Sequence, residues 1–287
     1  MRIDGSMRDL VEAAGSGSIA AVAKREQAAR NHLEEIIVAE RMHNVLSVMR
    51  ESVEEGLRPD LRSVTGMVGG QAALLSRHAP NAMGGPVLGR AIARAMAVAE
   101  CNACMGKIVA APTAGACGIL PASLLTMQEE RGYTDAQVVD ALFTAAAVGR
   151  VIAGRASISG AEGGCQAECG TAAAMTAAAL AELQGGTPAM ASDACAFAVM
   201  NSLGLVCDPV GGLVEVPCVY RNVAGVALAL TAADMALAGI VSPLNADEVI
   251  DAMKAVGDAM PAGLRETGEG GCAACAGGGA RRTRPQA

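Results

Sequence analysis

Three of the ten cysteines lie in short segments rich in glycine or proline, where a thiol could serve as a metal ligand. Cys165 occurs in the segment GGCQ, Cys207 in VCDPVGG and Cys218 in VPCVYRN. Loops of this kind can direct three sulfurs toward one point, and three thiolates would leave one iron of a four-iron four-sulfur cluster without a protein ligand. Such an iron can act as a Lewis acid toward a substrate oxygen. From the spacing alone, an iron–sulfur cluster is one hypothesis among several.

Two other cofactors compete with the cluster. Zinc would use the CxxC pairs Cys101/Cys104 and Cys272/Cys275, but the two pairs are much further apart in the chain than those of a zinc ribbon or finger. Pyridoxal phosphate would need a lysine to form a Schiff base. The chain has only three lysines, and none lies in an alternating strand and helix pattern of the kind that pyridoxal enzymes use. The sequence therefore favours neither zinc nor pyridoxal phosphate.

Three longer motifs resemble the iron–sulfur-dependent L-serine dehydratases, also called L-serine ammonia-lyases. The motifs are APTAGACGILP at residues 111–121, ASISGAEGGCQ at 156–166 and LGLVCDPVGGLVEVPC at 203–218, and the ending RETGEGG at 265–271 fits as well. The resemblance runs from about Asn44 to Gly271. Motifs of this length and composition rarely agree by chance, so the resemblance places the cluster above the other hypotheses.

The resemblance implies a site, a reaction and a partner. In that family the cysteines that match Cys165, Cys207 and Cys218 hold a four-iron four-sulfur cluster, and the substrate occupies the iron that lacks a protein ligand. The implied reaction is dehydration of L-serine, which yields pyruvate and ammonia. The chain has no room for the regulatory domain of single-chain members, so it resembles the α subunit of the two-subunit form. A β subunit with an ACT-type domain is then the implied partner.

Removal of the weakly acidic α-proton of serine requires a general base, and the motif loops offer several carboxylates. The candidate bases are Glu100, Glu162 and Glu168, and Asp208 and Glu215 lie in the same loops. The three histidines lie outside the motifs and receive no role. The choice among the carboxylates stays open.

The carboxylate and ammonium groups of the substrate also need partners. Backbone N–H groups of Gly-rich turns can bind anions, and short hydroxyl or amide side chains can assist. Asn222, at the end of a loop, could equally orient substrate or cap backbone groups. We expect substrate contacts from Thr113, Ala114, Gly115, Ser157, Ser159, Gly160 and Asn102. Whether a monovalent cation is also required stays open.

Two alternative functions remain. An iron–sulfur protein for electron transfer or redox sensing would favour four protein ligands, whereas this chain offers three loop cysteines. The same lyase chemistry could act on L-threonine or L-cysteine, because one methyl group gives only modest discrimination. In single-chain relatives a terminal cysteine folds back onto the open iron, and here Cys272 or Cys275 is the candidate for that position.

A few positions depart from the family pattern. Arg155 stands where asparagine usually precedes the ASIS motif, and a guanidinium beside the cluster loop would need an acidic partner. Cys272 stands where leucine usually follows the glycine pair, and Cys104 and Cys169 replace small apolar residues. We expect Cys117, Cys169 and Cys195 to be core cysteines.

The elements that must position these residues are predicted to be helices. Only two Phe and two Tyr are present although 52% of the residues are hydrophobic, which suits close helix packing better than a β-sandwich or barrel. Helical patterns cover 7–57, 87–109, 122–130, 135–152, 168–183, 189–203, 221–238 and 246–260, with Gly-rich loops at 110–121, 157–170 and 204–222. We predict an all-α fold with one helical catalytic domain over 1–271, whose first 43 residues are less certain, and a flexible tail over 272–287.

Charge and targeting signals argue against two classes of partner. The formal net charge is −7, and the only basic cluster lies in the tail, so we expect no nucleic-acid binding. The N-terminus lacks the pattern of a signal peptide, and the longest uncharged stretch, 108–128, contains two prolines and two glycines. We expect a cytoplasmic protein that does not span a membrane.

Overall fold

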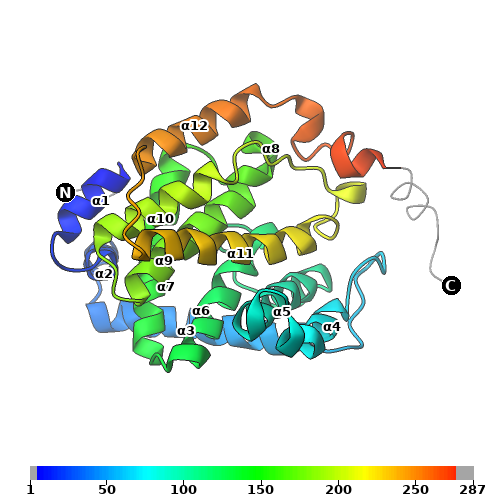
Figure 1. Cartoon of the computed structure of the whole chain (residues 1–287), viewed down its shortest axis with the longest axis horizontal. Helices are drawn as coiled ribbons and strands as arrows, with labels where there is room; N and C mark the ends of the chain where they lie inside the picture. The colour runs from blue at the N-terminus through cyan, green and yellow to red at the C-terminus, as the bar shows by residue number, and fades with distance from the viewer. Residues whose placement is uncertain (1–4, 276–287) are drawn as a thin grey trace.

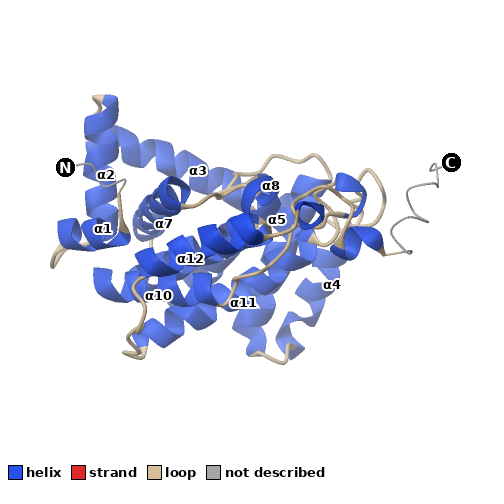
Figure 2. Ribbon diagram, turned by 90° about the horizontal axis from the view of Figure 1, so that it is seen from above, coloured by secondary structure: helices blue, strands red, loops and turns tan. Residues whose placement is uncertain are grey.

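The structure, a computed structural model, describes residues 5–275 and is built from helices in that range. No β-strand occurs among these residues (Figure 2), where strand-like pairing is limited to one bridge between Cys207 and Arg265. The predicted all-α fold is confirmed.

The helices follow one another with short connections. Their bounds are α1 (Met7–Ala14), α2 (Ile19–Asn31), α3 (Glu35–Gly56), α4 (Gln71–His78), α5 (Gly85–Ala103), α6 (Ile119–Arg131), α7 (Asp135–Arg155), α8 (Gly160–Gly163), α9 (Thr171–Leu183), α10 (Pro188–Met200), α11 (Cys218–Leu237) and α12 (Ala246–Ala259). A π-helical turn, Gln166–Gly170, leads directly into α9. Short 3-10 turns occur at Ala79–Asn81, Ala114–Ala116, Val210–Gly212, Ala262–Leu264 and Gly271–Ala274.

Helix α9 forms the centre of the fold. Every residue from Thr171 to Ala181 is buried, and helices α6, α7, α10 and α11 pack around it (Figure 1). A helix that is apolar on all sides belongs in a core, and its many alanines let the neighbouring helices approach closely. Because α9 continues the π-helical turn that follows Cys165, the most buried helix also fixes the second Gly-rich loop.

The N-terminal helices belong to the same packed body. The Glu182 carboxylate, at the end of α9, accepts hydrogen bonds from the backbone N–H groups of Ile19 (2.9 Å) and Ala20 (3.1 Å) at the start of α2. The Asp247 carboxylate accepts one from the N–H of Met7 at 2.8 Å. These bonds satisfy N–H groups that a helix start leaves without partners. The region before residue 44 is thus tied to the helices that carry the motifs.

Several helix ends differ from the predicted ones for local reasons. Helix α6 begins at Ile119 rather than at 122, because Pro121 lies in its first turn, where a missing N–H costs little. Helix α5 ends at Ala103 rather than at 109, because Met105 takes a φ of 64° and the Gly106 N–H bonds back to Cys101. Helix α4 was not predicted, since the surrounding glycines indicated turns.

Helix α7 is, among residues 5–275, the one helix long and apolar enough to cross a membrane. Two thirds of its apolar stretch is buried inside the molecule, where it packs against α2 and α9. This burial is typical of the core helix of a globular protein.

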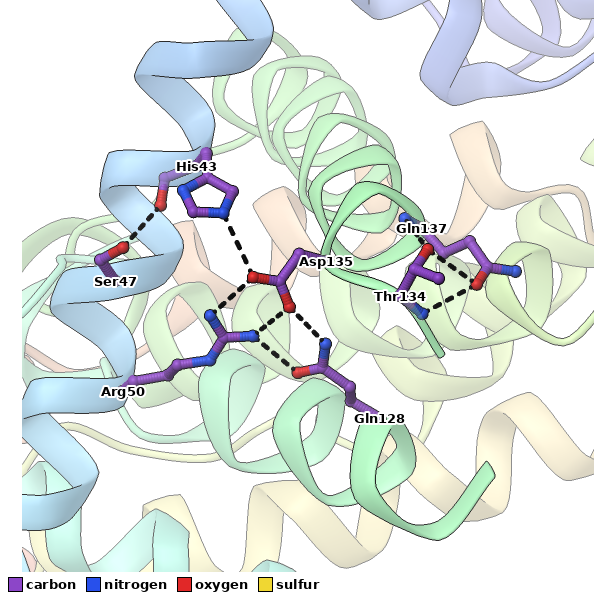
Figure 3. Close-up of polar contacts among 7 residues, drawn as sticks. All are labelled: His43, Ser47, Arg50, Gln128, Thr134, Asp135 and Gln137. Atoms are coloured by element: carbon purple, nitrogen blue, oxygen red, sulfur yellow. Dashed lines mark hydrogen bonds and ion pairs between the residues drawn. The ribbon is translucent and has the colours of Figure 1, made fainter. Parts of the chain in front are cut away.

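A polar network joins α3 to α6 and α7 at the surface of the fold (Figure 3). Asp135, the first residue of α7, accepts hydrogen bonds from Arg50 at 2.5 and 2.9 Å and from Gln128 at 2.8 Å. His43 Nε2 lies 3.2 Å from the same carboxylate. The Arg50 guanidinium, assisted by Gln128, holds the pKa of Asp135 well below its usual value. Of the three histidines, His43 thus has a structural partner outside the motif loops.

We expect Asp135→Asn to destabilise the fold in a pH-dependent manner. A carboxyl group whose pKa is lowered in the native state stabilises above its unfolded pKa, and this contribution is lost as the pH falls through the native pKa. Because Asp135 is 40% exposed, the loss at pH 7 should be only about 1 kcal/mol. Urea unfolding followed by circular dichroism should show this difference at pH 7 and a progressively smaller one below about pH 4.

Asp60→Asn, which removes an exposed ion pair with Arg58, is the matched control and should change stability less. A constant difference between wild type and Asp135→Asn from pH 7 to pH 3 would contradict the assignment of the effect to this carboxylate.

Candidate active site

Residues of all three Gly-rich loops meet at the Glu168 carboxylate. A methyl group at Gly160 would lie 2.7 Å from Glu168 Oε2 and 2.8 Å from Cys207 Sγ. A methyl group at Gly115 would lie 3.4 Å from Glu168 Oε1 and 3.6 Å from Val214. Glycine is required at position 160 because any side chain there would collide with the acid and the thiol. These contacts bring the three loops together at one carboxylate, whereas their convergence on a cluster stays a prediction.

The three loop cysteines are buried around this carboxylate. Cys165, Cys207 and Cys218 are 2%, 4% and 9% exposed, and Cys207 Sγ lies 4.0 Å from Glu168 Oε2. Cys165 directly precedes the π-helical turn, and Cys218 is the first residue of α11. Two of the thiols thus lie where a helical segment begins.

The charges of these groups influence one another. Burial raises the pKa of Cys218 to about 12, and the nearby Cys165 and Glu168 act in the same direction. Burial, followed by Glu168 and Cys165, likewise raises the pKa of Cys207. The three thiols therefore share one electrostatic environment. Iron binding would have to displace their protons, as it does whenever a thiol becomes a ligand.

Arg221 brings a positive charge to the same place. Its guanidinium donates a hydrogen bond to the Val206 carbonyl at 2.7 Å and forms an ion pair with Asp208 at 2.7 Å. A hydrogen bond with Cys169 lowers the pKa of Cys165, and Arg221 contributes to the same shift. The sequence analysis missed this arginine, although its position three residues after Cys218, in the first turn of α11, was the available signal.

Glu168 is the candidate base that lies among the cysteines. Burial raises its pKa above the ordinary value for glutamate, and Glu266 adds to the shift, while Thr113 and Arg221 oppose it. Thr113 Oγ1 is buried and makes no well-formed hydrogen bond, so it remains available to a ligand. This arrangement supplies a carboxylate with increased proton affinity beside a hydroxyl group and two glycines.

The other two candidate bases have different surroundings. Glu100 is fully buried and accepts hydrogen bonds from the backbone N–H groups of Gly69, Gln71 and Ala72 at 2.8 to 3.1 Å. It therefore anchors the start of α4. Glu162 is exposed and accepts a hydrogen bond from the Ser157 hydroxyl at 2.6 Å.

Two further acids that the sequence placed in these loops also have structural partners. Glu215 accepts hydrogen bonds from the hydroxyl groups of Ser63 and Thr65 and so ties the loop at 60–70 to the third motif. Asp208 pairs with Arg221 and accepts a hydrogen bond from the backbone N–H of Cys272. Neither carboxylate is left free to act as a base.

The predicted substrate residues fall into two groups. Thr113, Ala114, Gly115 and Gly160 lie on the side of Glu168, and Asn102 donates a hydrogen bond to the Ala114 carbonyl at 3.3 Å. The Ser157 hydroxyl accepts a hydrogen bond from the Ser159 N–H at 3.0 Å and donates one to Glu162. These residues lie beside a neighbouring cavity of about 380 Å³, which is lined by Ser157, Glu162, Arg265 and Thr267 among others.

Asn222 holds the first and third loops together. Its side chain accepts a hydrogen bond from the Gly118 N–H at 2.8 Å and donates to the carbonyls of Gly115 (2.7 Å) and Cys218 (2.9 Å). It is completely buried. Of the two roles that the sequence left open for Asn222, the structure supports capping of backbone groups.

The segment that follows α12 closes the third loop. The Cys207 N–H bonds to the Leu264 carbonyl at 2.9 Å, and the Glu266 N–H bonds to the Cys207 carbonyl at 2.7 Å. Further along, the Cys272 N–H donates to Asp208 Oδ2 at 2.6 Å, whereas Cys275 is exposed. The predicted flexible tail begins within a 3-10 turn, Gly271–Ala274, and the residues of that tail after Cys275 lie outside the described residues.

Arg155 does not intrude on the cysteine loop. Its guanidinium lies 2.6 Å from Asp251 and 3.6 Å from Asp247, both on α12, and it also donates to the Gly5 carbonyl. The acidic partners that the sequence analysis required are therefore present, and Arg155 joins α7 to α12.

The donor chemistry suits iron–sulfur binding better than zinc. Among residues 5–275, no three His, Cys, Asp or Glu side chains are close enough together to hold one metal ion. A four-iron cluster instead takes each thiolate on a different iron and so accepts more widely spaced ligands. Three buried thiols, one from the second Gly-rich loop and two from the third, with no disulfide among them, fit that requirement.

Comparisons with known proteins agree with these motifs. Residues 3–273 match the family model described as serine dehydratase alpha chain. The chain is 50% identical over 239 residues to the "Probable L-serine dehydratase, alpha chain" of Bacillus subtilis (strain 168). The aligned region covers 83% of this chain and 79% of that protein. It is 43% identical over 250 residues to the L-serine dehydratase alpha chain of Peptoniphilus asaccharolyticus, which covers 86% of each. The L-serine dehydratase TdcG of Escherichia coli (strain K12) is 45% identical over 181 residues, or 62% of this chain and 40% of that protein.

Proposed function

Because the chain belongs to the serine dehydratase alpha chain family, we propose that it is the catalytic subunit of a lyase that converts L-serine to pyruvate and ammonia. The observation that carries the proposal is the meeting of three buried thiols with a half-buried glutamate of raised pKa, on loops whose glycines allow close approach. The names of the relatives support L-serine as the substrate.

In this proposal Cys165, Cys207 and Cys218 hold a four-iron four-sulfur cluster. When bound, the cluster supplies a Lewis-acidic iron that makes the β-hydroxyl of serine a better leaving group. The role of the chain is to present three thiolates from loops fixed by α9 and α11 and to keep bulk water away from them. Their low exposure meets the second requirement.

Glu168 is the residue that we assign to removal of the α-proton. A base is most effective when its pKa lies near the working pH, and burial moves the pKa of Glu168 in that direction. Thr113 and the backbone of Gly115 lie beside its carboxylate and are placed to orient the substrate carboxylate. Glu100 is less suited, since three backbone amides occupy its oxygens.

A single set of assays tests the function. The chain is purified anaerobically, with and without a candidate β subunit that bears an ACT-type domain, and its iron content and visible spectrum are recorded. Pyruvate formation from L-serine should exceed the 2-oxoacid formation from L-threonine and L-cysteine, and repetition with and without potassium ions tests for a monovalent cation. An iron-loaded chain without lyase activity in either preparation would instead indicate a redox or sensor protein.

The alpha-chain names of the relatives imply an enzyme with more than one kind of subunit. We propose a β subunit with an ACT-type domain as the partner of this chain. Co-purification of the two chains as one species in size-exclusion chromatography supports the partnership, and separate elution at micromolar concentrations argues against it.

We expect Cys272→Ser to change both substrate binding and cluster lifetime. Cys272 is held beside Asp208, next to Cys207, so its thiolate is the better placed of the two tail thiols to act as a resting-state ligand. Serine would have to displace such a ligand, so its removal should lower the apparent KM several-fold and shorten the lifetime of the cluster absorbance in air. Cys275→Ser is the control, because Cys275 is exposed, and should resemble wild type. Wild-type values for both variants would show that neither thiol reaches the cluster.

A further inference from the structure

Cys169 lies unusually close to the proposed ligand Cys165. The two sulfurs are 3.4 Å apart, one on each side of the π-helical turn, and both side chains are buried, with exposures of 2% for Cys165 and 4% for Cys169. A disulfide requires a sulfur separation of about 2.05 Å, so a small movement of the side chains would join them. The role expected for Cys169 from the sequence, packing in the core, does not by itself account for this pairing.

A second cavity gives small molecules access to Cys169. It has a volume of about 480 Å³ and is lined by Cys169, Ser202, Leu205 and Arg221, among others. Its rim includes Asn201, Leu203 and Gly204, all of which are exposed. A small oxidant that enters this cavity from solvent meets Cys169 first and Cys165 directly behind it.

We propose that Cys165 and Cys169 form a reversible disulfide when the iron-free chain meets a peroxide. One of the two sulfurs attacks one oxygen of hydrogen peroxide, the O–O bond breaks, and a sulfenic acid and one water result. The other sulfur then attacks the sulfenic sulfur, the S–O bond breaks, the S–S bond forms, and the second water leaves. The two thiols lose two electrons and two protons in total, which reduce the peroxide to two waters.

The disulfide protects Cys165, one of the three proposed ligands, from irreversible damage. A lone thiol next to an open cavity can pass from sulfenic to sulfinic and sulfonic acid, and thiols do not reverse the last two steps. A disulfide stops this sequence and returns to two thiols on reduction. That this protection helps the chain to bind a new cluster rests on the proposed function, whereas formation of the disulfide does not.

Peptide mapping tests the proposal without iron or activity. The full-length chain is stripped of iron, exposed to hydrogen peroxide, alkylated and cut with a Glu-specific protease. Cleavage after Glu162, Glu168 and Glu182 separates 163–168 from 169–182, and each peptide contains a single cysteine. The wild type should yield these two peptides joined by a disulfide, and dithiothreitol should restore both thiols.

Cys169→Ser and Cys169→Ala provide matched variants, with circular dichroism as the check on folding. In either variant Cys165 should accumulate sulfinic or sulfonic acid that dithiothreitol does not reverse, and reconstitution with ferrous iron and sulfide should recover several-fold less bound iron than in wild type. Absence of the joined peptides in wild type, with equal overoxidation of Cys165 in all three proteins, would overturn the proposal. Because the mapping uses the iron-free chain, a failure of the proposed lyase function would leave this result unchanged.

Discussion

Cys165→Ala, Cys207→Ala and Cys218→Ala are each expected to abolish cluster assembly and to reduce lyase activity to background. All three thiols are buried within one electrostatic environment beside Glu168, as expected for ligands of one cluster. Loss of one thiolate from a three-cysteine site leaves a second iron exposed. Iron and sulfide content, together with visible absorbance of anaerobically reconstituted protein, measure the effect.

Cys195→Ala is the control for these variants. Cys195 is completely buried in α10, away from the motif loops, and burial raises its pKa to about 12, as expected for an inert core thiol. The variant should keep its iron and most of its activity at the cost of about 1 kcal/mol of stability from the small cavity. Equal iron retention in all four variants would refute the ligand assignment.

Glu168→Gln is expected to lower kcat by about 10²–10⁴-fold while the cluster remains bound. Glutamine has nearly the same shape but cannot accept the proton, and it leaves all three cysteines in place. In the wild type, protonation of Glu168 at low pH has the same consequence. Because its pKa is raised, activity should begin to fall at a higher pH than an ordinary glutamate would produce. Steady-state rates from pH 5 to 9, with iron content measured in parallel, give both results.

Glu162→Gln is the matched control, because Glu162 is an exposed carboxylate that bonds to Ser157 on the adjacent cavity. We expect Glu162→Gln to lower kcat less than Glu168→Gln does. If Glu162→Gln were the more damaging substitution and Glu168→Gln stayed within tenfold of wild type, the base would have to be sought beside Ser157.

The fold class and the loops that approach one another could be predicted from the sequence. The choice of one carboxylate as the general base could not. Periodicity indicated helices because it depends on residues that are neighbours in the chain, and the scarcity of aromatic residues in the composition pointed the same way. Glu100 and Glu168 both lie in apolar surroundings, so pattern alone does not separate them. The difference lies in backbone N–H groups about 30 residues before Glu100, which only the folded structure brings to its carboxylate.

The same limit explains the arginines. Arg155 is adjacent to a motif in sequence, yet its charge is directed to Asp251 on α12. Arg221 belongs to a helix start and yet reaches Asp208 and the environment of Cys165. The partner that a long charged side chain finds for an ion pair depends on which helices pack beside it. Local sequence does not encode that packing.

The hydrogen bonds at the two ends of the described chain have a consequence for the order in which the protein is made. The N–H of Met7, the first of helix α1, bonds to Asp247, 240 residues later, and Cys207 finds its backbone partners only at Leu264 and Glu266. A ribosome produces these partners long after the helices that need them, so the body cannot close until α12 and the segment after it have emerged. The third ligand loop is therefore among the last parts to become ordered. Loading of iron should accordingly follow translation of this region, and a nascent chain stalled before residue 264 should fail to retain a cluster.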